Sequence, residues 1–139
     1  MTFVDTSFWV ALQFRRDGHH SEARAIWEAG PGPLVTTNHV LGETWTFLRR
    51  RTGHAAAVDF VTRAERSPAL TVRRVGEAAE RDAWRWLRRH GEREYSFVDA
   101  TSFAVMRSLR IVESLAFDGD FTAAGFVEVR AGGRGGPAA

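Results

Sequence analysis

Short apolar runs of the kind found in β-strands alternate with helix-patterned segments along most of this chain. Strands that are separated by helices favour a parallel sheet, because parallel neighbours need a crossover connection between them. The sequence therefore predicts an α/β fold: a three-layer α/β/α sandwich with a central parallel sheet. The expected strands are 2–4, 34–37, 70–75, 111–117 and 126–129, and the expected helices are 7–15, 21–29, 39–52 (capped by Asn38), 55–66, 77–90 and 97–109 (capped by Ser96).

The length of 139 residues fits one domain with one core. We assign residues 1–130 to this domain, since apolar residues recur throughout it and no repeat or linker interrupts it. Residues 131–139 read AGGRGGPAA and carry no apolar bulk. A segment of that composition cannot bury enough surface to offset its ordering entropy, so we expect this tail to be disordered.

The absence of cysteine excludes several kinds of chemistry. Disulfides, thiolate metal sites and cysteine nucleophiles are all ruled out. No apolar stretch approaches the roughly 20 residues that span a bilayer, and Asp5 interrupts the first apolar run. We therefore expect a cytoplasmic protein with no membrane partner.

Charge alone does not identify a partner. All 19 basic residues are arginine, and the formal net charge is only +2. A nucleic-acid partner therefore has to be argued from specific residues and not from bulk charge. The sequence also lacks the GxxxxGK[ST] and GxGxxG phosphate-binding loops, which argues against a nucleoside triphosphate enzyme.

Four acidic residues from distant parts of the chain are expected at one edge of the sheet. Asp5 and Asp118 each follow a predicted strand, and Glu43 and Asp99 lie in the first turns of helices that begin near the same edge. Ligand sites in open α/β sheets form outside the carboxyl ends of the strands. The topology therefore predicts that these four acids converge.

Such a cluster has a chemical use. Carboxylates that are packed together repel one another, and a divalent cation compensates this repulsion. Mg²⁺ and Mn²⁺ favour carboxylate and water oxygens as ligands. A bound ion of this kind can activate water for attack on a phosphodiester, and a neighbouring carboxylate can accept the proton.

Two of these acids also have structural interpretations within their helices. Asp5 is a good N-cap for the helix that follows it, and this leaves its role open. Asp99 lies in a first helical turn, where the helix dipole favours an acid. However, helical spacing places Asp99 on the apolar stripe of Phe103 and Met106, and an acid there needs a partner or a metal.

The other acids are individually weak signals. Glu43 lies at the edge of the apolar face of its helix, which is a common place for a boundary glutamate. Asp118 and Asp120 flank Gly119, and Asp-Gly is a common turn sequence. It is the joint placement of the acids that favours a site.

Four segments of this chain together resemble the PIN domain, and most closely the VapC toxins of type II toxin–antitoxin systems. They are FVDTSFWVAL, TTNHVLGETWTFL, YSFVDATSFAVM and SLAFDGDF, and the resemblance covers about residues 1–130. It implies a PIN-like α/β/α fold and a Mg²⁺- or Mn²⁺-dependent endoribonuclease that hydrolyses RNA. It also implies a homodimer that is neutralised by a VapB-like antitoxin, whose tail occupies the acidic site.

The resemblance assigns roles to individual positions. The catalytic acids would be Asp5, Glu43, Asp99 and Asp118, of which Asp5, Asp99 and Asp118 would hold the metal. Glu43 would either bind the metal or orient the attacking water, and Asp120 matches an additional acid of some members. Thr6 and Ser7 match polar positions where a hydroxyl serves metal-bound water or phosphate.

Several alternatives stay open. Arg49, Arg50 and Arg51 end the helix of Glu43, where arginines suit the helix dipole, but they are also candidates for RNA phosphate contacts. A stand-alone PIN nuclease in RNA processing would share the four acids. A non-catalytic module that binds RNA or protein is a third possibility, although retention of all four acids argues against it.

Overall fold

The computed structural model describes residues 1–135, which form a single six-stranded sheet with helices on both faces. The strand order is β3-β2-β1-β4-β5-β6. The strands β1 to β5 pair in parallel, and β6 pairs antiparallel with β5. The strand bounds are β1 Thr2–Val4, β2 Leu34–Thr37, β3 Leu70–Arg73, β4 Glu113–Leu115, β5 Val127–Arg130 and β6 Gly133–Gly135.

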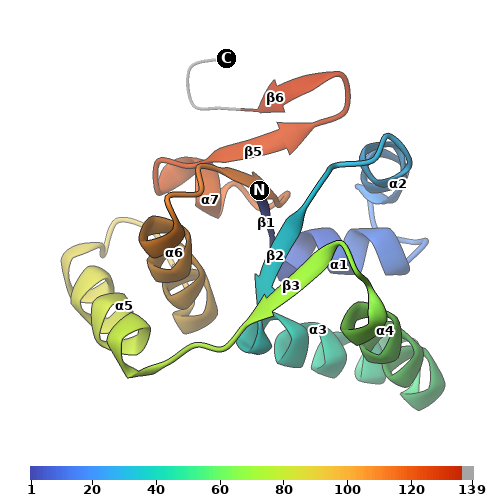
Figure 1. Cartoon of the computed structure of the whole chain (residues 1–139), viewed down its shortest axis with the longest axis horizontal. Coiled ribbons are helices and arrows are strands. Elements are labelled where there is room, and N and C mark those ends of the chain that lie inside the picture. The colour runs from blue at the N-terminus through green and yellow to red at the C-terminus, as the bar shows by residue number, and fades with distance from the viewer. Residues whose placement is uncertain (136–139) are drawn as a thin grey trace.

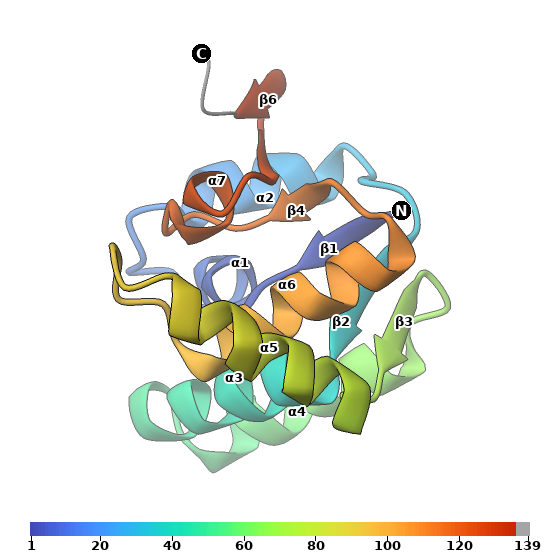
Figure 2. The same ribbon diagram turned by 90° about the vertical axis from the view of Figure 1, so that its left-hand side faces the viewer.

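Seven helices complete the described part of the chain. Figure 1 shows α5 and α6 on one side of the sheet and α1, α2 and α4 on the other, with α3 passing beneath, and Figure 2 places α5 nearest the viewer. The predicted three-layer α/β/α fold is therefore confirmed. The helix bounds are α1 Thr6–Gln13, α2 His20–Glu28, α3 Asn38–Arg51, α4 His54–Arg66, α5 Glu77–Arg89, α6 Phe97–Leu109 and α7 Asp120–Ala123.

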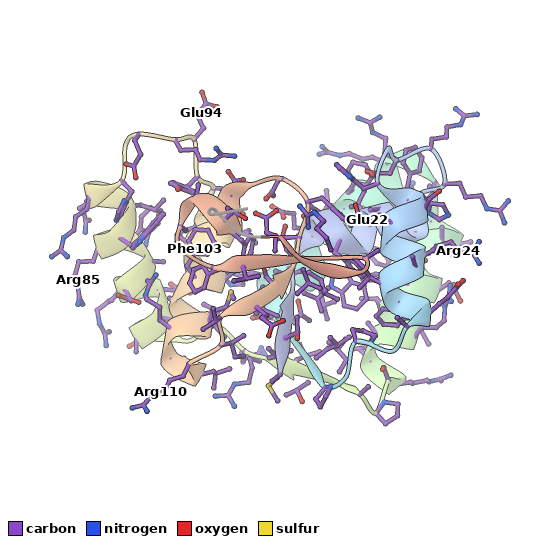
Figure 3. The ribbon with its side chains drawn as sticks, turned by 90° about the horizontal axis from the view of Figure 1, so that it is seen from above. Glu22, Arg24, Arg85, Glu94, Phe103 and Arg110 are labelled. Carbon is purple, nitrogen blue, oxygen red and sulfur yellow. The ribbon has the colours of Figure 1, made fainter. Side chains whose placement is uncertain are left out.

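Aromatic side chains fill the core between the sheet and the α5–α6 layer. Phe103 of α6 points into this layer in Figure 3, and its ring lies 4.9 Å from Phe121 and 5.4 Å from Phe126. Phe3 of β1 contacts Phe121 from the sheet side, and both are fully buried. These contacts pack α6 and α7 against β1 and β5. Apart from Glu43, the predicted acidic residues lie at or beside the ends of the elements that are held in this way.

The N-terminal cap of α3 is one residue earlier than predicted. Thr37, and not Asn38, accepts the hydrogen bond from the backbone of Val40, at 3.1 Å. The Asn38 side chain instead accepts from the backbone of Val75, at 2.9 Å. Threonine and asparagine are both good caps, so the local sequence does not choose between them.

Two elements near the carboxyl end of the chain were not predicted. Helix α7 is only four residues long, which is too short to show helical periodicity. Strand β6 pairs with β5 within residues 133–135, so the predicted disorder of 131–139 is wrong there. Glycine-rich backbone can still complete a sheet ladder, because the ladder needs no side chains. Residues 136–139 lie outside the described residues.

Within residues 1–135, no helix is both long enough and apolar enough to cross a membrane.

Candidate metal and phosphodiester site

The predicted acids line one hollow at the carboxyl edge of the sheet. The hollow has a volume of about 500 Å³ and lies where β1 and β4 end and α6 begins. Seven carboxylates line it, namely Asp5, Asp17, Glu43, Glu94, Asp99, Asp118 and Asp120. All four acids that the sequence predicted to converge are among them. Their catalytic roles remain predictions.

Asp5 caps the N-terminus of α1 and also lines this hollow. Its Oδ2 accepts hydrogen bonds from the Ser7 backbone, at 3.1 Å, and from the Ser7 hydroxyl, at 2.7 Å. The residue is only 2% exposed. No hydrogen bond engages its Oδ1 in the part of the chain that the structure describes. The capping interpretation and the ligand interpretation are therefore compatible, since each uses a different oxygen.

Asp99 is held in the same manner at the start of α6. Its Oδ2 accepts from the backbone of Ser96, and the Ser96 hydroxyl accepts from the backbone of Asp99, which completes a capping box. Asp99 is 8% exposed, and Phe103 and Met106 below it are fully buried. The apolar stripe thus buries Asp99 beside the hollow, as the helical spacing predicted.

Asp118 and Asp120 flank a tight turn at Gly119. Gly119 has φ 81°, which is the left-handed region, and the Asp118 carboxylate accepts from the backbone of Asp120 at 3.1 Å. Arg93 donates to the Asp120 carboxylate at 2.5 Å and to the Asp118 carbonyl at 3.1 Å. This turn brings one carboxylate oxygen each of Asp99, Asp118 and Asp120 within 4.8 Å of one another.

Crowding and burial perturb the acids of this cluster. Burial raises the pKa of Asp99 to about 6, and the charges of Asp118 and Asp120 add to this shift. Burial also raises the pKa of Asp5 well above its usual value, with a further contribution from Asp118. Burial likewise raises the pKa of Asp118, and the charges of Asp120 and Glu128 reinforce it. These carboxylates oppose one another's ionisation in the metal-free protein.

The donor set suits a hard divalent cation. Three carboxylate oxygens converge, Asp5 lies close enough to Asp118 and Asp99 for their charges to interact, and each buried acid keeps one oxygen outside its cap. Oxygen ligands of this kind favour Mg²⁺, Mn²⁺ or Ca²⁺ over softer metals. A cation would also relieve the repulsion that raises these pKa values.

The other predicted site residues differ in their placement. Glu43 lines the hollow from α3 as an exposed residue and does not belong to the group of converging oxygens. Thr6 also lines the hollow, and its hydroxyl is buried without a hydrogen-bond partner within residues 1–135. The Ser7 hydroxyl is already engaged, because it donates to Asp5 and accepts from the backbone of Phe117 at 3.0 Å.

The three arginines at the end of α3 lie outside the hollow. Arg49, Arg50 and Arg51 are exposed in the last turn of the helix. The Arg51 guanidinium lies 5.4 Å from the centre of the Phe47 ring, and Phe47 lines the hollow. This places at least one arginine of the cluster beside the rim.

The sequence did not single out several residues that complete the site. His19 is exposed at the rim, and its ring stacks on Phe117 at 4.5 Å. Glu94, which stands on the loop between α5 and α6 in Figure 3, and Asp17 add acidic lining. From β5, Glu128 contacts the Gly119 turn and Arg130 contacts Glu128 and the carbonyl of Ala116. These contacts join residues from different elements, so no local sequence signal marks them.

A second hollow, of about 390 Å³, lies among α1, α2 and α4. Trp9, Trp27 and Phe60 line it, and none of the residues between 1 and 135 that line it carries a carboxylate.

Comparison with known proteins gives a consistent result. Residues 2–127 match the PIN domain family. The 23S rRNA-specific endonuclease VapC20 of Mycobacterium tuberculosis, in strains CDC 1551/Oshkosh and ATCC 25618/H37Rv, is 57% identical over 130 residues, which cover 94% of this chain and 98% of that protein. The crystal structure of Mycobacterium tuberculosis VapC20, a sarcin–ricin loop cleaving toxin, matches with a TM-score of 0.88 over 94% of this chain and 99% of that one.

Proposed function

This chain belongs to the PIN-domain family, and we propose that it is a VapC-like toxin that acts as a metal-dependent endoribonuclease. The observation that carries the proposal is the set of carboxylates from β1, α6 and the Gly119 turn, converging in one hollow. The extensive similarity to a 23S rRNA-specific endonuclease supports RNA as the substrate class. We further propose the sarcin–ricin loop of 23S rRNA as the target, because that loop is cleaved by the protein of the matching crystal structure.

The roles of the acids follow from their positions. Asp5, Asp99 and Asp118 would hold Mg²⁺ or Mn²⁺, with Asp120 as a further candidate. When bound, such an ion neutralises developing charge on the phosphoryl group and lowers the pKa of a water. Glu43, exposed on α3 where it lines the hollow, accepts a proton from the attacking water or orients it. The Thr6 hydroxyl donates to a phosphate oxygen, since nothing in the described residues engages it.

The decisive experiment is cleavage of a sarcin–ricin loop RNA by the purified protein. Reactions would contain Mn²⁺, Mg²⁺ or a chelator, and Asp99→Asn would be run beside the wild type. Asparagine can still accept the hydrogen bond from the backbone of Ser96, so the capping box is kept while the charge is lost. We expect metal-dependent cleavage by the wild type and none by the variant.

Asp59→Asn is the matched control. Asp59 is an exposed acid on α4 that pairs with Arg63 and lies outside the acidic hollow. We expect this variant to cleave as the wild type does. Equal cleavage by Asp99→Asn and the wild type would refute the assigned site, and cleavage that survives the chelator would refute metal dependence.

We also propose that Arg49, Arg50 and Arg51 contact RNA phosphates beside the rim. Their exposure and the position of Arg51 on Phe47 support this. Each phosphate contact contributes about one counterion to the salt dependence of binding, so Arg51→Ala should reduce the slope of log K against log salt by about 1. Arg85, which points away from the body on α5 in Figure 3, supplies the control Arg85→Ala. An unchanged slope in Arg51→Ala would exclude the contact.

Two protein partners complete the proposal. A VapB-like antitoxin is supported by the toxin description of the similar VapC20 structure, and co-purification with the product of a small adjacent gene tests it. A homodimer is supported by Trp84, which is 48% exposed on α5 and whose ring lies 4.6 Å from that of Phe97. Trp84 is exposed and Phe97 is half-buried, and aromatic residues presented in this way are typical of interfaces. Light scattering that finds only a monomer would exclude the dimer.

A further inference from the structure

The turn that carries Asp118 and Asp120 is held from a neighbouring strand. Glu128 of β5 points its carboxylate under this turn and accepts from the backbone of Gly119 at 3.3 Å and of Thr122 at 2.9 Å. Within residues 1–135, the N-cap residue of helix α7, Gly119, supplies no side-chain cap to this helix, which begins at Asp120. Glu128 therefore satisfies amide groups of the turn and of the first residues of α7, which would otherwise lack an acceptor.

Arg130 holds the other end of the same segment. Its guanidinium donates to Glu128 at 3.0 Å and to the carbonyl of Ala116 at 2.7 Å. It also lies 4.9 Å from the centre of the Phe117 ring. Glu128 and Arg130, which we call the β5 brace, thus contact the backbone on both sides of Asp118. The segment 116–122 is fixed at three points.

The buried carboxylate of Glu128 is not explained by the stability of the fold alone. Glu128 is 1% exposed, and an ion pair at such a place often adds little stability over apolar residues of similar size. Glu128 also adds negative charge beside Asp118, which already has acidic neighbours. The contacts that Glu128 makes are specific to the geometry of the turn. That combination suits a residue that sets the position of the metal-binding acids.

We propose that the β5 brace positions Asp118 and Asp120 for cation binding, with Glu128 as its central residue. The inference rests on the proposed function. Groups that orient metal ligands from outside the coordination sphere typically change metal affinity or activity by about 10–100-fold when they are mutated. Glu128 acts through the backbone of the turn, so it is a positioning residue and not a ligand.

Glu128→Gln tests the brace. The amide keeps the size of the side chain, but its NH₂ group faces a backbone N–H or the Arg130 guanidinium, so at least one of the three hydrogen bonds is lost. Titration calorimetry with Mn²⁺ should show affinity weakened by at least about 10-fold. Ser114→Ala is the matched control, because it removes a part-buried hydrogen bond from the Ser114 hydroxyl to the Val127 carbonyl in the strand pair β4–β5, away from the turn.

Amide exchange gives a readout that needs no metal. In the metal-free wild type, the amides of Gly119 and Thr122 are protected by Glu128. We expect Glu128→Gln to lose protection at one or both of these amides, according to which oxygen the NH₂ group replaces, and Ser114→Ala to keep protection at both. If Glu128→Gln does not fold, Arg130→Gln is the second variant, since it removes the guanidinium contacts to Glu128 and Ala116 but leaves Glu128 to accept from Gly119 and Thr122. It should weaken Mn²⁺ binding by a smaller factor.

Cleavage separates positioning from general destabilisation. Glu128→Gln should lower kcat at limiting Mn²⁺, leave KM for the RNA unchanged, and recover when Mn²⁺ is raised. A variant that is merely less stable would not recover in this way. If the wild type binds Mn²⁺ and Glu128→Gln matches Ser114→Ala in affinity, the brace is refuted while the proposed function stands. If the wild type binds no Mn²⁺, it is the proposed function that fails.

Discussion

Asp5 and Asp99 are held by residues within three positions of themselves, whereas the turn of Asp118 and Asp120 has one local hydrogen bond and also depends on contacts from other elements. Asp5 and Asp99 each engage one oxygen in the cap of their own helix. Asp118 and Asp120 stand on a turn that Glu128 supports from β5 and that Arg93 contacts from the loop before α6. We refer to these two pairs as the capped half and the braced half of the site.

The difference has a physical consequence. A cap forms together with its helix, so each carboxylate of the capped half is oriented on its own helix as soon as that helix forms. The braced half requires the sheet to be complete as far as β5, because its supports come from distant residues. We therefore expect the capped half to be rigid in the metal-free protein and the braced half to govern how well a cation is bound.

The largest expected effect comes from Asp5 in the capped half. Asp5→Asn can keep the hydrogen bonds from Ser7 but loses the charge, so cleavage should fall by about 10³-fold or more, which corresponds to several kcal/mol of lost electrostatic stabilisation. Its melting temperature should stay at or above that of the metal-free wild type, since repulsion with Asp118 is relieved. Cleavage assays and thermal melts measure the two effects.

Asp5→Ala separates capping from catalysis. This variant loses both the charge and the cap, and loss of an N-cap costs about 1 kcal/mol of stability. We expect it to be as inactive as Asp5→Asn but to melt at a lower temperature. Equal melting temperatures for the two variants would mean that the cap contributes nothing to the stability of the fold.

The second largest effect is the dependence of metal-free stability on pH. The native pKa of Asp99 is about 6, against an ordinary value of 3.8, and that of Asp5 is also raised. Between pH 3.8 and about 6, Asp99 makes the native state bind more protons than the unfolded state. Stability is therefore lost as pH rises through about 6. The loss is on the order of 2–3 kcal/mol for Asp99 alone. Denaturant unfolding with chelator present, from pH 4.5 to 7.5, measures it.

Saturating Mn²⁺ should reverse this trend, because binding requires the ionised carboxylates. Asp99→Asn should flatten the pH dependence of the metal-free protein. If metal-free stability instead rises between pH 5 and 7, the buried acids do not have raised pKa values, and the electrostatic account of the site is wrong.

The capped half was predictable from the sequence because its signals are local. Asp99 on the stripe of Phe103 and Met106, with Ser96 three residues before it, already indicates a capped and buried acid. The order of strands and helices likewise followed from periodicity, and the parallel sheet followed from the alternation. The convergence of the acids required only the rule that ligand sites lie at the carboxyl ends of parallel strands.

The support of the braced half could not be predicted in the same way. Glu128 lies in a short strand where an outward, solvated glutamate would be the ordinary expectation, and only the tertiary structure shows it buried. Helix α7 is too short for periodicity, and the sequence gives no indication that Arg93 pairs with Asp120. The glycine-rich strand β6 has no apolar pattern to mark it.

A smaller effect is expected at the turn of the braced half. Gly119 has φ 81°, and a Cβ there would lie 3.1 Å from the Arg93 guanidinium, so Gly119→Ala combines backbone strain with displacement of Arg93. The strain costs about 1–2 kcal/mol of stability. Gly125→Ala is the control, because Gly125 has φ 99° with open space around it. Both variants should lose similar stability in denaturant, but only Gly119→Ala should also bind Mn²⁺ more weakly.

Ser7 carries the smallest expected effect, although it connects the two halves. Its hydroxyl donates to Asp5 and accepts from the backbone of Phe117, the residue that precedes Asp118. Ser7→Ala leaves the Phe117 amide without this acceptor, at a cost of about 1–2 kcal/mol. If the capped half and the braced half are independent, Ser7→Ala should weaken Mn²⁺ binding less than Glu128→Gln does. The losses in binding free energy of the two variants should then add in the double variant. A non-additive loss in calorimetry would mean that Ser7 couples the cap to the turn, and the site would then act as a single unit.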